Sequence, residues 1–294
     1  MELLNTRRLL ITAFTGVALL VAAVAQAADP LSSWNDTDTK KAIISFVEKT
    51  TSDSNSADYV APEDRIVTFD NDGTLWVEHP MYTQLAFALD RVKKLAPQHP
   101  EWKTTQPFKA VLDNDMKALG AAGEKGLLEL VMASHAGMST ADFEKEVSAW
   151  FATAKHPRFK RPYTDLTYLP MVELLEYLRA NGFKTYIVSG GGIEFMRPMT
   201  QAVYGIPPEQ VIGSSNSDGD RQMLEWTGAG DGLRLMGLVY HDDAEREYAY
   251  GPAGGLPSSP FGTFSQSTMD EAKKNGWQII SMKNDWARIF AFDE

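Results

Sequence analysis

The feature that most constrains the fold of this chain is a short apolar run that ends in two closely spaced carboxylates. Residues 65–69 are rich in β-branched and aromatic side chains, which is typical of a buried strand, and Asp70, Asn71, Asp72 and Gly73 follow directly. The glycine permits a tight turn at the strand end. In open parallel sheets, ligands bind outside the carboxyl ends of the strands. The pattern therefore predicts an α/β protein with a ligand site at the end of this strand.

The paired acids suggest a specific chemistry. Two carboxylates separated by one residue repel each other unless a cation or a proton lies between them. Mg²⁺ prefers oxygen ligands of this kind and would neutralise the acids together with a substrate phosphate. Asp70 could then attack phosphorus as a nucleophile, while Asp72 gives a proton to the leaving oxygen and later takes one from water. The Thr74 hydroxyl could orient the nucleophile. The alternative is a solvated Asx-type turn, which the preceding apolar strand argues against.

Strand and helix patterns alternate along the rest of the chain. Residues 183–188 are predicted to form a second strand that ends in Ser189 and three glycines, followed by a helix over 193–203 and a short strand at 211–212. This order implies parallel pairing with right-handed crossovers, and hence a Rossmann-like parallel sheet core. Further predicted elements are helices over 37–50, 170–180, 268–275 and 285–290, a strand over 278–282, and a long loop over 251–267.

Residues 82–155 show only helical periodicity. Four apolar helical segments are expected there, and Ser139 with Thr140 can cap the last of them. A block of helices between two strands indicates an insert on an α/β core. We therefore expect a core formed by residues 28–79 and 163–294, with an α-helical cap over residues 80–162.

The N-terminus has the layout of a cleavable secretory signal. Arg7 and Arg8 precede an apolar run, Leu9–Val24, and the small residues Ala25 and Ala27 suit a signal peptidase, so we place cleavage after residue 27. The arginine pair also resembles a twin-arginine signal. The alternative is a membrane anchor, for which the run is short. We therefore expect a periplasmic or secreted protein without a stable membrane anchor after cleavage.

Charge and cysteine content exclude several functions. The formal net charge is −11, so no basic excess exists to bind nucleic acid or an anionic membrane. The chain has no cysteine, which excludes thiol catalysis and disulfides.

Two segments resemble motifs of the haloacid dehalogenase superfamily. Residues 69–75 (Phe-Asp-Asn-Asp-Gly-Thr-Leu) are similar to the first motif, Asp-x-Asp-Gly-Thr after an apolar strand, whose second Asp marks the phosphatases. Ser189 ends the next strand as the second motif does, in a form similar to that of phosphoserine phosphatases. The resemblance implies an exported, Mg²⁺-dependent phosphomonoesterase that hydrolyses small phosphate esters through an aspartyl phosphate. It implies catalytic roles for Asp70, Asp72 and Ser189, and phosphate binding by Gly73, Thr74, Gly190 and Gly191.

A fourth motif of the superfamily is an acidic turn that completes the metal site, and residues 216–220 (Asn-Ser-Asp-Gly-Asp) resemble it. In one register Asn216 takes the place of the first acid and Asp220 is the second. In a shifted register Asp218 is the second acid. We favour the first register because Asp220 leads directly into a predicted helix. The implied metal ligands are Asp70, Asp72, Asn216, Asp218 and Asp220.

The chain departs from the superfamily between the second and fourth motifs. The third motif is a Lys or Arg that neutralises the nucleophile and the phosphate, but this interval holds no Lys and only Arg197. The interval is also short, which indicates that a segment with one core strand and the Lys is missing. The alternative function is therefore a catalytically impaired relative that binds phosphate or another ligand. Lys160, Arg161 and Arg221 could replace the Lys, although each is more simply a solvated surface charge.

Other polar residues have weaker signals. Glu78 and His79 follow the first motif and either contact substrate or form a hinge at the cap entry. Residues 241–243 (His-Asp-Asp) could form a metal cluster, but the sequence after them favours a solvated helix start. The sequence does not identify the substrate or the oligomeric state.

Overall fold

The computed structural model describes residues 29–213 and 219–294. Its central feature is a three-stranded parallel sheet in the order β1-β2-β3, formed by β1 (Ile66–Phe69), β2 (Lys184–Ser189) and β3 (Val211–Gly213). Phe69 lies opposite Ile187, so the acidic residues after β1 and the glycines after β2 leave the sheet at the same edge. The predicted parallel α/β core is confirmed. The predicted signal, residues 1–27, lies outside the described residues.

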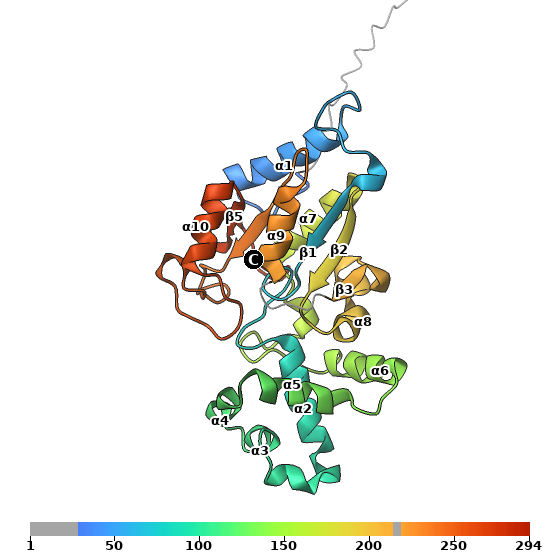
Figure 1. Cartoon of the computed structure of the whole chain (residues 1–294), viewed down its shortest axis with the longest axis vertical. Helices are drawn as coiled ribbons and strands as arrows, with labels where there is room; N and C mark the ends of the chain where they lie inside the picture. Colours follow the sequence, from blue (N-terminus) through green and yellow to red (C-terminus); the bar gives the residue numbers. More distant parts are fainter. Residues whose placement is uncertain (1–28, 214–218) are drawn as a thin grey trace, which may run out of the picture.

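A second parallel sheet lies apart from the first. It consists of β4 (Gly237–Tyr240) and β5 (Gln278–Ser281). Helix α9 (Gly219–Ala229) contacts both sheets: the Met223 sulfur lies 3.2 Å from the Thr68 hydroxyl of β1, and Leu224 packs with Trp277 beside β4 and β5 (Figure 1). Within the described ranges, β1 pairs with a strand on one side only.

Helices flank the sheets, and their ends follow local sequence rules. The Thr37 hydroxyl caps the first helix, the Ser265 hydroxyl caps α10, and Gly205 ends α8 in the left-handed conformation. These helices lie close to their predicted positions. The core helices are α1 (Asp38–Thr51), α7 (Leu169–Ala180), α8 (Ile193–Tyr204), α10 (Gln266–Asn275) and α11 (Met282–Asp285).

The helix predicted over residues 285–290 is wrong. The helical turn ends at Asp285, whose carboxylate accepts a hydrogen bond from the Ser281 backbone N–H at 2.8 Å. Trp286 is extended, fully buried, and forms a bridge with Trp34. Burial of this large ring against the N-terminal segment therefore overrides the local helical pattern.

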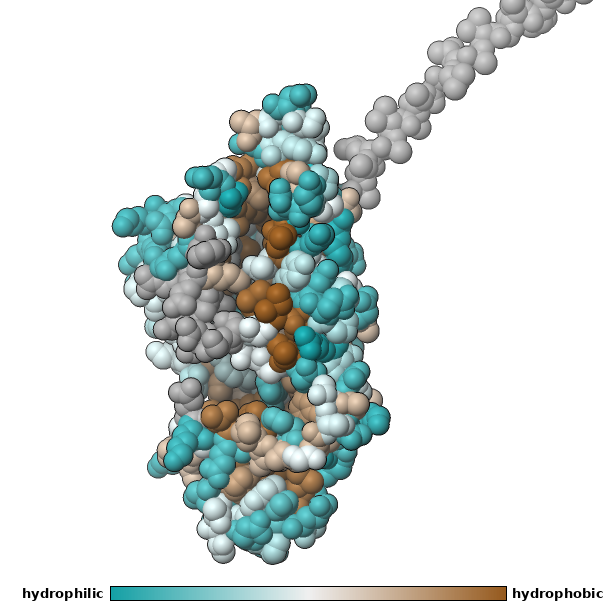
Figure 2. All heavy atoms as spheres, turned by 45° about the vertical axis from the view of Figure 1, so that its right-hand side comes forward, coloured by the Kyte–Doolittle hydropathy of each residue, from teal (hydrophilic) through white to brown (hydrophobic). Residues whose placement is uncertain are grey.

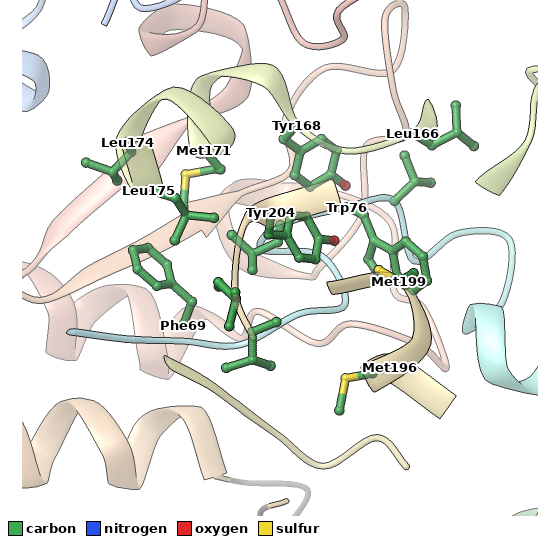
Figure 3. Close-up of a cluster of buried hydrophobic side chains, with 14 of the residues drawn as sticks. Phe69, Trp76, Leu166, Tyr168, Met171, Leu174, Leu175, Met196, Met199 and Tyr204 are labelled. Carbon is green, nitrogen blue, oxygen red and sulfur yellow. The ribbon is translucent and has the colours of Figure 1, made fainter. Parts of the chain in front are cut away.

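The main hydrophobic core lies between the first sheet and α7 and α8 (Figure 3). Phe69 of β1 and Leu175 of α7 lie on one side of this cluster, and Met199 and Tyr204 of α8 lie close to Trp76. Trp76 and Tyr204 are each only 1% exposed. The segment after β1 is therefore anchored in the core by its tryptophan.

Residues 85–130 of the insert form their own hydrophobic cluster at the far end of the molecule from α1 (Figure 1), whereas the buried residues of the last insert helix, 140–151, belong to the main core. The insert helices join the core through rings of α2, α6 and α8: Phe87 lies 5.7 Å from Phe143 and 5.5 Å from Phe195, measured between ring centroids. One predicted helix is divided into α3 and α4, because Asn114 has a φ of 54°. These helices are α2 (Thr83–Leu95), α3 (Phe108–Leu112), α4 (Met116–Ala121), α5 (Gly123–His135) and α6 (Thr140–Phe151).

Apolar surface forms a column on the upper half of the molecule, which contains the sheets (Figure 2). Ile66 of β1 is 57% exposed and Ile212 of β3 is 46% exposed. Across the described ranges, no helix combines the length and the apolar character needed to cross a membrane.

Candidate active site

The acidic turn, residues 70–75, follows β1 and is closed by backbone hydrogen bonds. The Asn71 carbonyl accepts from the Thr74 N–H at 3.2 Å and from the Leu75 N–H at 2.8 Å. Gly73 has a φ of +69°, which favours glycine, and its N–H donates to the Trp76 carbonyl at 2.9 Å. Asp70 and Asp72 are half-buried. The turn thus holds two carboxylates in fixed positions at the strand ends.

Asp72 faces the end of β2. The Trp76 indole N–H donates to Asp72 Oδ1 at 2.7 Å. A Cβ placed on Gly191 would lie 3.7 Å from Asp72 Oδ2 and 3.6 Å from Ser189 Oγ. Ser189 is buried, and its hydroxyl accepts from the Gly191 N–H at 3.3 Å. The structure therefore brings together a carboxylate oxygen, a hydroxyl and a glycine backbone from two segments that are far apart in the sequence.

Burial and the charges of the two aspartates raise the pKa of two tyrosines. Burial, followed by the charges of Asp72 and Asp70, raises the pKa of Tyr204 well above its ordinary value. The Tyr204 hydroxyl donates to Asn71 Oδ1 at 3.1 Å. Burial and then the charges of Glu78, Asp72 and Asp70 raise the pKa of Tyr82 to about 12. The two aspartates therefore form one negative centre bordered by phenol groups that stay neutral.

The glycines after β2 lead into α8. Gly192 is the N-cap of this 12-residue helix, so the partial positive charge of its N-terminus lies at the same edge as the acidic turn. The Gly192 N–H donates to Gln84 Oε1 of α2 at 2.8 Å, which ties a cap helix to the strand end. A pocket of about 270 Å³ opens beside this contact, lined by Gln84, His135 and Thr140 and by Gly192–Phe195.

A buried polar cluster behind the turn was missed from sequence. Glu78 is only 4% exposed, and its Oε1 accepts from the Tyr250 hydroxyl at 2.7 Å. Burial, the largest cause, raises the pKa of Glu78 to about 7. His241 is 5% exposed and its Nε2 lies 2.7 Å from the Gly73 carbonyl oxygen. The solvated helix start predicted after it is wrong, because residues 244–247 form a turn in which Glu247 is buried. The unrecognised signal was an apolar strand, β4, directly before the histidine.

The donor set at the acidic turn fits a hard divalent cation, because it consists of two adjacent carboxylates. The other predicted ligands cannot be placed beside it: Asn216 and Asp218 lie outside the described residues, as does the side chain of Asp220 in α9. Within the described part of the chain, no group of three or more His, Asp or Glu side chains could hold a metal.

Two of the three basic side chains proposed as substitutes for the missing Lys are on the surface. Lys160 and Arg161 are exposed, with the Arg161 guanidinium over the Phe292 ring at 4.0 Å. Arg197 forms an ion pair with Glu194 within α8 at 2.6 Å. The side chain of Arg221 lies outside the described part of the structure.

Comparisons with known proteins agree with the motifs. A family model for haloacid dehalogenase-like hydrolases matches residues 67–252, which is more than half of the chain. No curated protein matches. One similar solved structure is a phosphoserine phosphohydrolase-like protein from Francisella tularensis subsp. tularensis SCHU S4, with 20% identity, a TM-score of 0.28, and coverage of 53% of this chain and 61% of that one. The chain thus spans about three-fifths of that protein's length. Because the family model includes both the acidic turn and the glycines after β2, the chain belongs to the haloacid dehalogenase-like hydrolases.

Proposed function

We propose that this protein is a Mg²⁺-dependent phosphomonoesterase that hydrolyses small phosphate esters. One observation carries the proposal: Asp72 Oδ2 and Ser189 Oγ both lie within 3.7 Å of the Cβ position of Gly191. An anion in this space would meet a hydroxyl, the N-terminal end of α8 and a carboxyl group that can carry a proton. These are the groups that ester hydrolysis at phosphorus requires.

The proposed reaction uses residues of the acidic turn in two steps. Asp70 attacks phosphorus and forms an aspartyl phosphate, while protonated Asp72 gives its proton to the departing alcohol oxygen. Asp72 then takes a proton from water, which attacks the phosphoryl group and releases phosphate and Asp70. The Ser189 hydroxyl donates a hydrogen bond to the phosphoryl oxygens. Mg²⁺, bound by Asp70 and Asp72 with ligands from residues 216–220, would offset the negative charge of the acids and the ester.

The surroundings of the site favour a small phosphate ester that is exported or extracellular. The cap helices reach the strand ends through Gln84, and the adjacent pocket of about 270 Å³ suits a small molecule. The net charge of −11 argues against nucleic-acid substrates. The predicted N-terminal signal would direct the protein to a periplasmic or secreted location.

Hydrolysis of p-nitrophenyl phosphate, with Mg²⁺ and with EDTA, tests the proposal. We expect turnover that needs Mg²⁺ and is lost in Asp70→Asn. Gly191→Ala is a second test, because its methyl would make only ordinary contacts yet would occupy the space between Ser189 and Asp72. It should abolish turnover without loss of thermal stability. Gly120→Ala, in a helix with open space around it, is the matched control and should leave turnover unchanged. Turnover that survives Asp70→Asn would refute the mechanism.

A second candidate is a catalytically impaired family member that binds phosphate or another ligand. The one-sided pairing of β1 favours it, since a missing strand would have bordered the site. In this case the chain as it stands would show no turnover with any metal, but inorganic phosphate would still raise the melting temperature. An insertion that restores a Lys-bearing strand before Asn216 would then produce activity.

A further inference from the structure

His241 lies directly behind the acidic turn. It follows β4, is buried, and its Nε2 is 2.7 Å from the Gly73 carbonyl oxygen. A carbonyl oxygen can only accept a hydrogen bond, so Nε2 must carry a proton and donate it. This contact joins the second sheet to the turn that contains Asp72, across 168 residues of sequence.

Glu247 fixes the orientation of this histidine. Its side chain is completely buried, and its Oε2 lies 3.2 Å from His241 Nδ1. A carboxylate there accepts a hydrogen bond from the Nδ1–H, so the ring forms hydrogen bonds at both nitrogens. Burial works against the charged ring, but the hydrogen bond and charge of Glu247 outweigh it and raise the pKa of His241. The ring also packs at 4.4 Å from the Tyr250 ring, measured between centroids. The imidazole therefore has one orientation.

Both backbone polar groups of Gly73 form hydrogen bonds. Its carbonyl accepts from His241, and its N–H donates to the Trp76 carbonyl at 2.9 Å. Trp76 in turn holds Asp72 Oδ1 through its indole N–H. A rotation of the backbone at Gly73 would move both contacts, and with them the carboxyl group of Asp72.

We propose that His241, oriented by Glu247, is a positioning residue that fixes the acid/base Asp72 through the Gly73 carbonyl. The inference rests on the proposed phosphomonoesterase function for its kinetic consequence, but the positioning itself can be observed without turnover. Because displacements of about 1 Å can cost ~100-fold in rate, the loss of this hydrogen bond should lower kcat and leave substrate binding largely intact.

The test uses the full chain and two measurements. In ¹H–¹⁵N spectra, the Trp76 indole signal, assigned by its loss in Trp76→Phe, reports the contact with Asp72. We expect His241→Leu to shift this signal and to lower kcat ~100-fold with KM within about twofold. His241→Gln keeps an N–H donor and should restore the signal position and most of kcat. His99→Leu, a partly exposed histidine of the cap, is the matched control and should change neither.

Glu247→Gln covers the case in which His241→Leu does not fold, because it keeps the shape and an acceptor oxygen. It should shift the Trp76 signal in the same direction and lower kcat about tenfold. Unchanged Trp76 signals in the folded His241 and Glu247 variants would overturn the proposal, as would an unchanged kcat in an active enzyme. If the wild-type protein hydrolyses no ester, the proposed function fails, while the spectra still decide the positioning role.

Discussion

Replacing Glu78 with Gln should stabilise the protein, and the gain should grow as the pH rises. Glu78 is only 4% exposed, and burial raises its pKa from 4.5 to about 7. Below pH 4.5 the carboxyl group is protonated in both the folded and the unfolded chain. Between pH 4.5 and 7 the unfolded chain releases the proton while the folded chain retains it, so the wild-type protein loses stability. Gln does not titrate, and its carbonyl can still accept the hydrogen bond from Tyr250.

The expected magnitude follows from the pKa shift. A shift from 4.5 to about 7 corresponds to about 3 kcal/mol. The free energy of unfolding of Glu78→Gln, relative to wild type, should therefore increase by about 3 kcal/mol between pH 4.5 and pH 8. In melting temperature this is a relative gain of roughly 6–12 °C. Coupling to His241 is already contained in this shift, since its charge lowers the pKa of Glu78.

Urea unfolding at a series of pH values, in buffer with EDTA, measures this difference. EDTA removes any metal that would stabilise the folded acidic turn by binding to it. Glu63→Gln is the matched control, because Glu63 is exposed and its substitution should give a difference that does not vary with pH. A pH-independent difference for Glu78→Gln as well would show that Glu78 is not held in its protonated form by burial, and would refute the reasoning.

Three further substitutions test other parts of the structure. Gly73→Ala should lower the free energy of unfolding by more than the ~1–2 kcal/mol that an alanine in the left-handed conformation costs, because its Cβ would lie 2.5 Å from Glu78 Oε1. Gly276 has nearly the same φ but open space around it, so chemical unfolding of Gly276→Ala measures the backbone cost alone. Phe195→Ala should cost about 3–5 kcal/mol in unfolding free energy, because its ring joins α8 to the rings of α2 and α6; a loss under 1 kcal/mol would contradict this role. Ser265→Ala removes the N-cap of α10 and should cost about 1 kcal/mol, seen as a lower melting temperature, whereas an unchanged value would show that the hydroxyl does not cap the helix.

Sequence patterns predicted those parts of the fold that depend on neighbouring residues. The strand before Asp70 and the strand before Ser189 are apolar runs with clear ends, and the structure has both within one residue of the predicted bounds. Parallel pairing then implied that the two strand ends share an edge. The approach of Asp72 Oδ2 and Ser189 Oγ to Gly191 agrees with that implication.

Long-range burial was the part that could not be predicted. Residues 241–247 carry six ionisable side chains and have the composition of a solvated segment. Yet His241 and Glu247 are buried, because they bond to each other and the distant Gly73 carbonyl oxygen bonds to the second imidazole nitrogen. No local periodicity encodes such partners. The helix predicted over 285–290 failed for a similar reason, since the burial of Trp286 depends on a bridge to Trp34.

Contacts from outside β1 hold the acidic turn in place. Apart from β1 itself, its backbone is held by the segment before α7: the Tyr168 N–H donates to the Leu75 carbonyl at 2.9 Å, and the Val77 N–H donates to the Leu166 carbonyl at 3.1 Å. His241 adds a contact from the second sheet. None of these bonds comes from the open edge of β1. Ile66, which is 57% exposed, lies at the opposite end of β1 from Asp70. The geometry of the aspartates therefore depends on the segment before α7 and on His241 beside the second sheet.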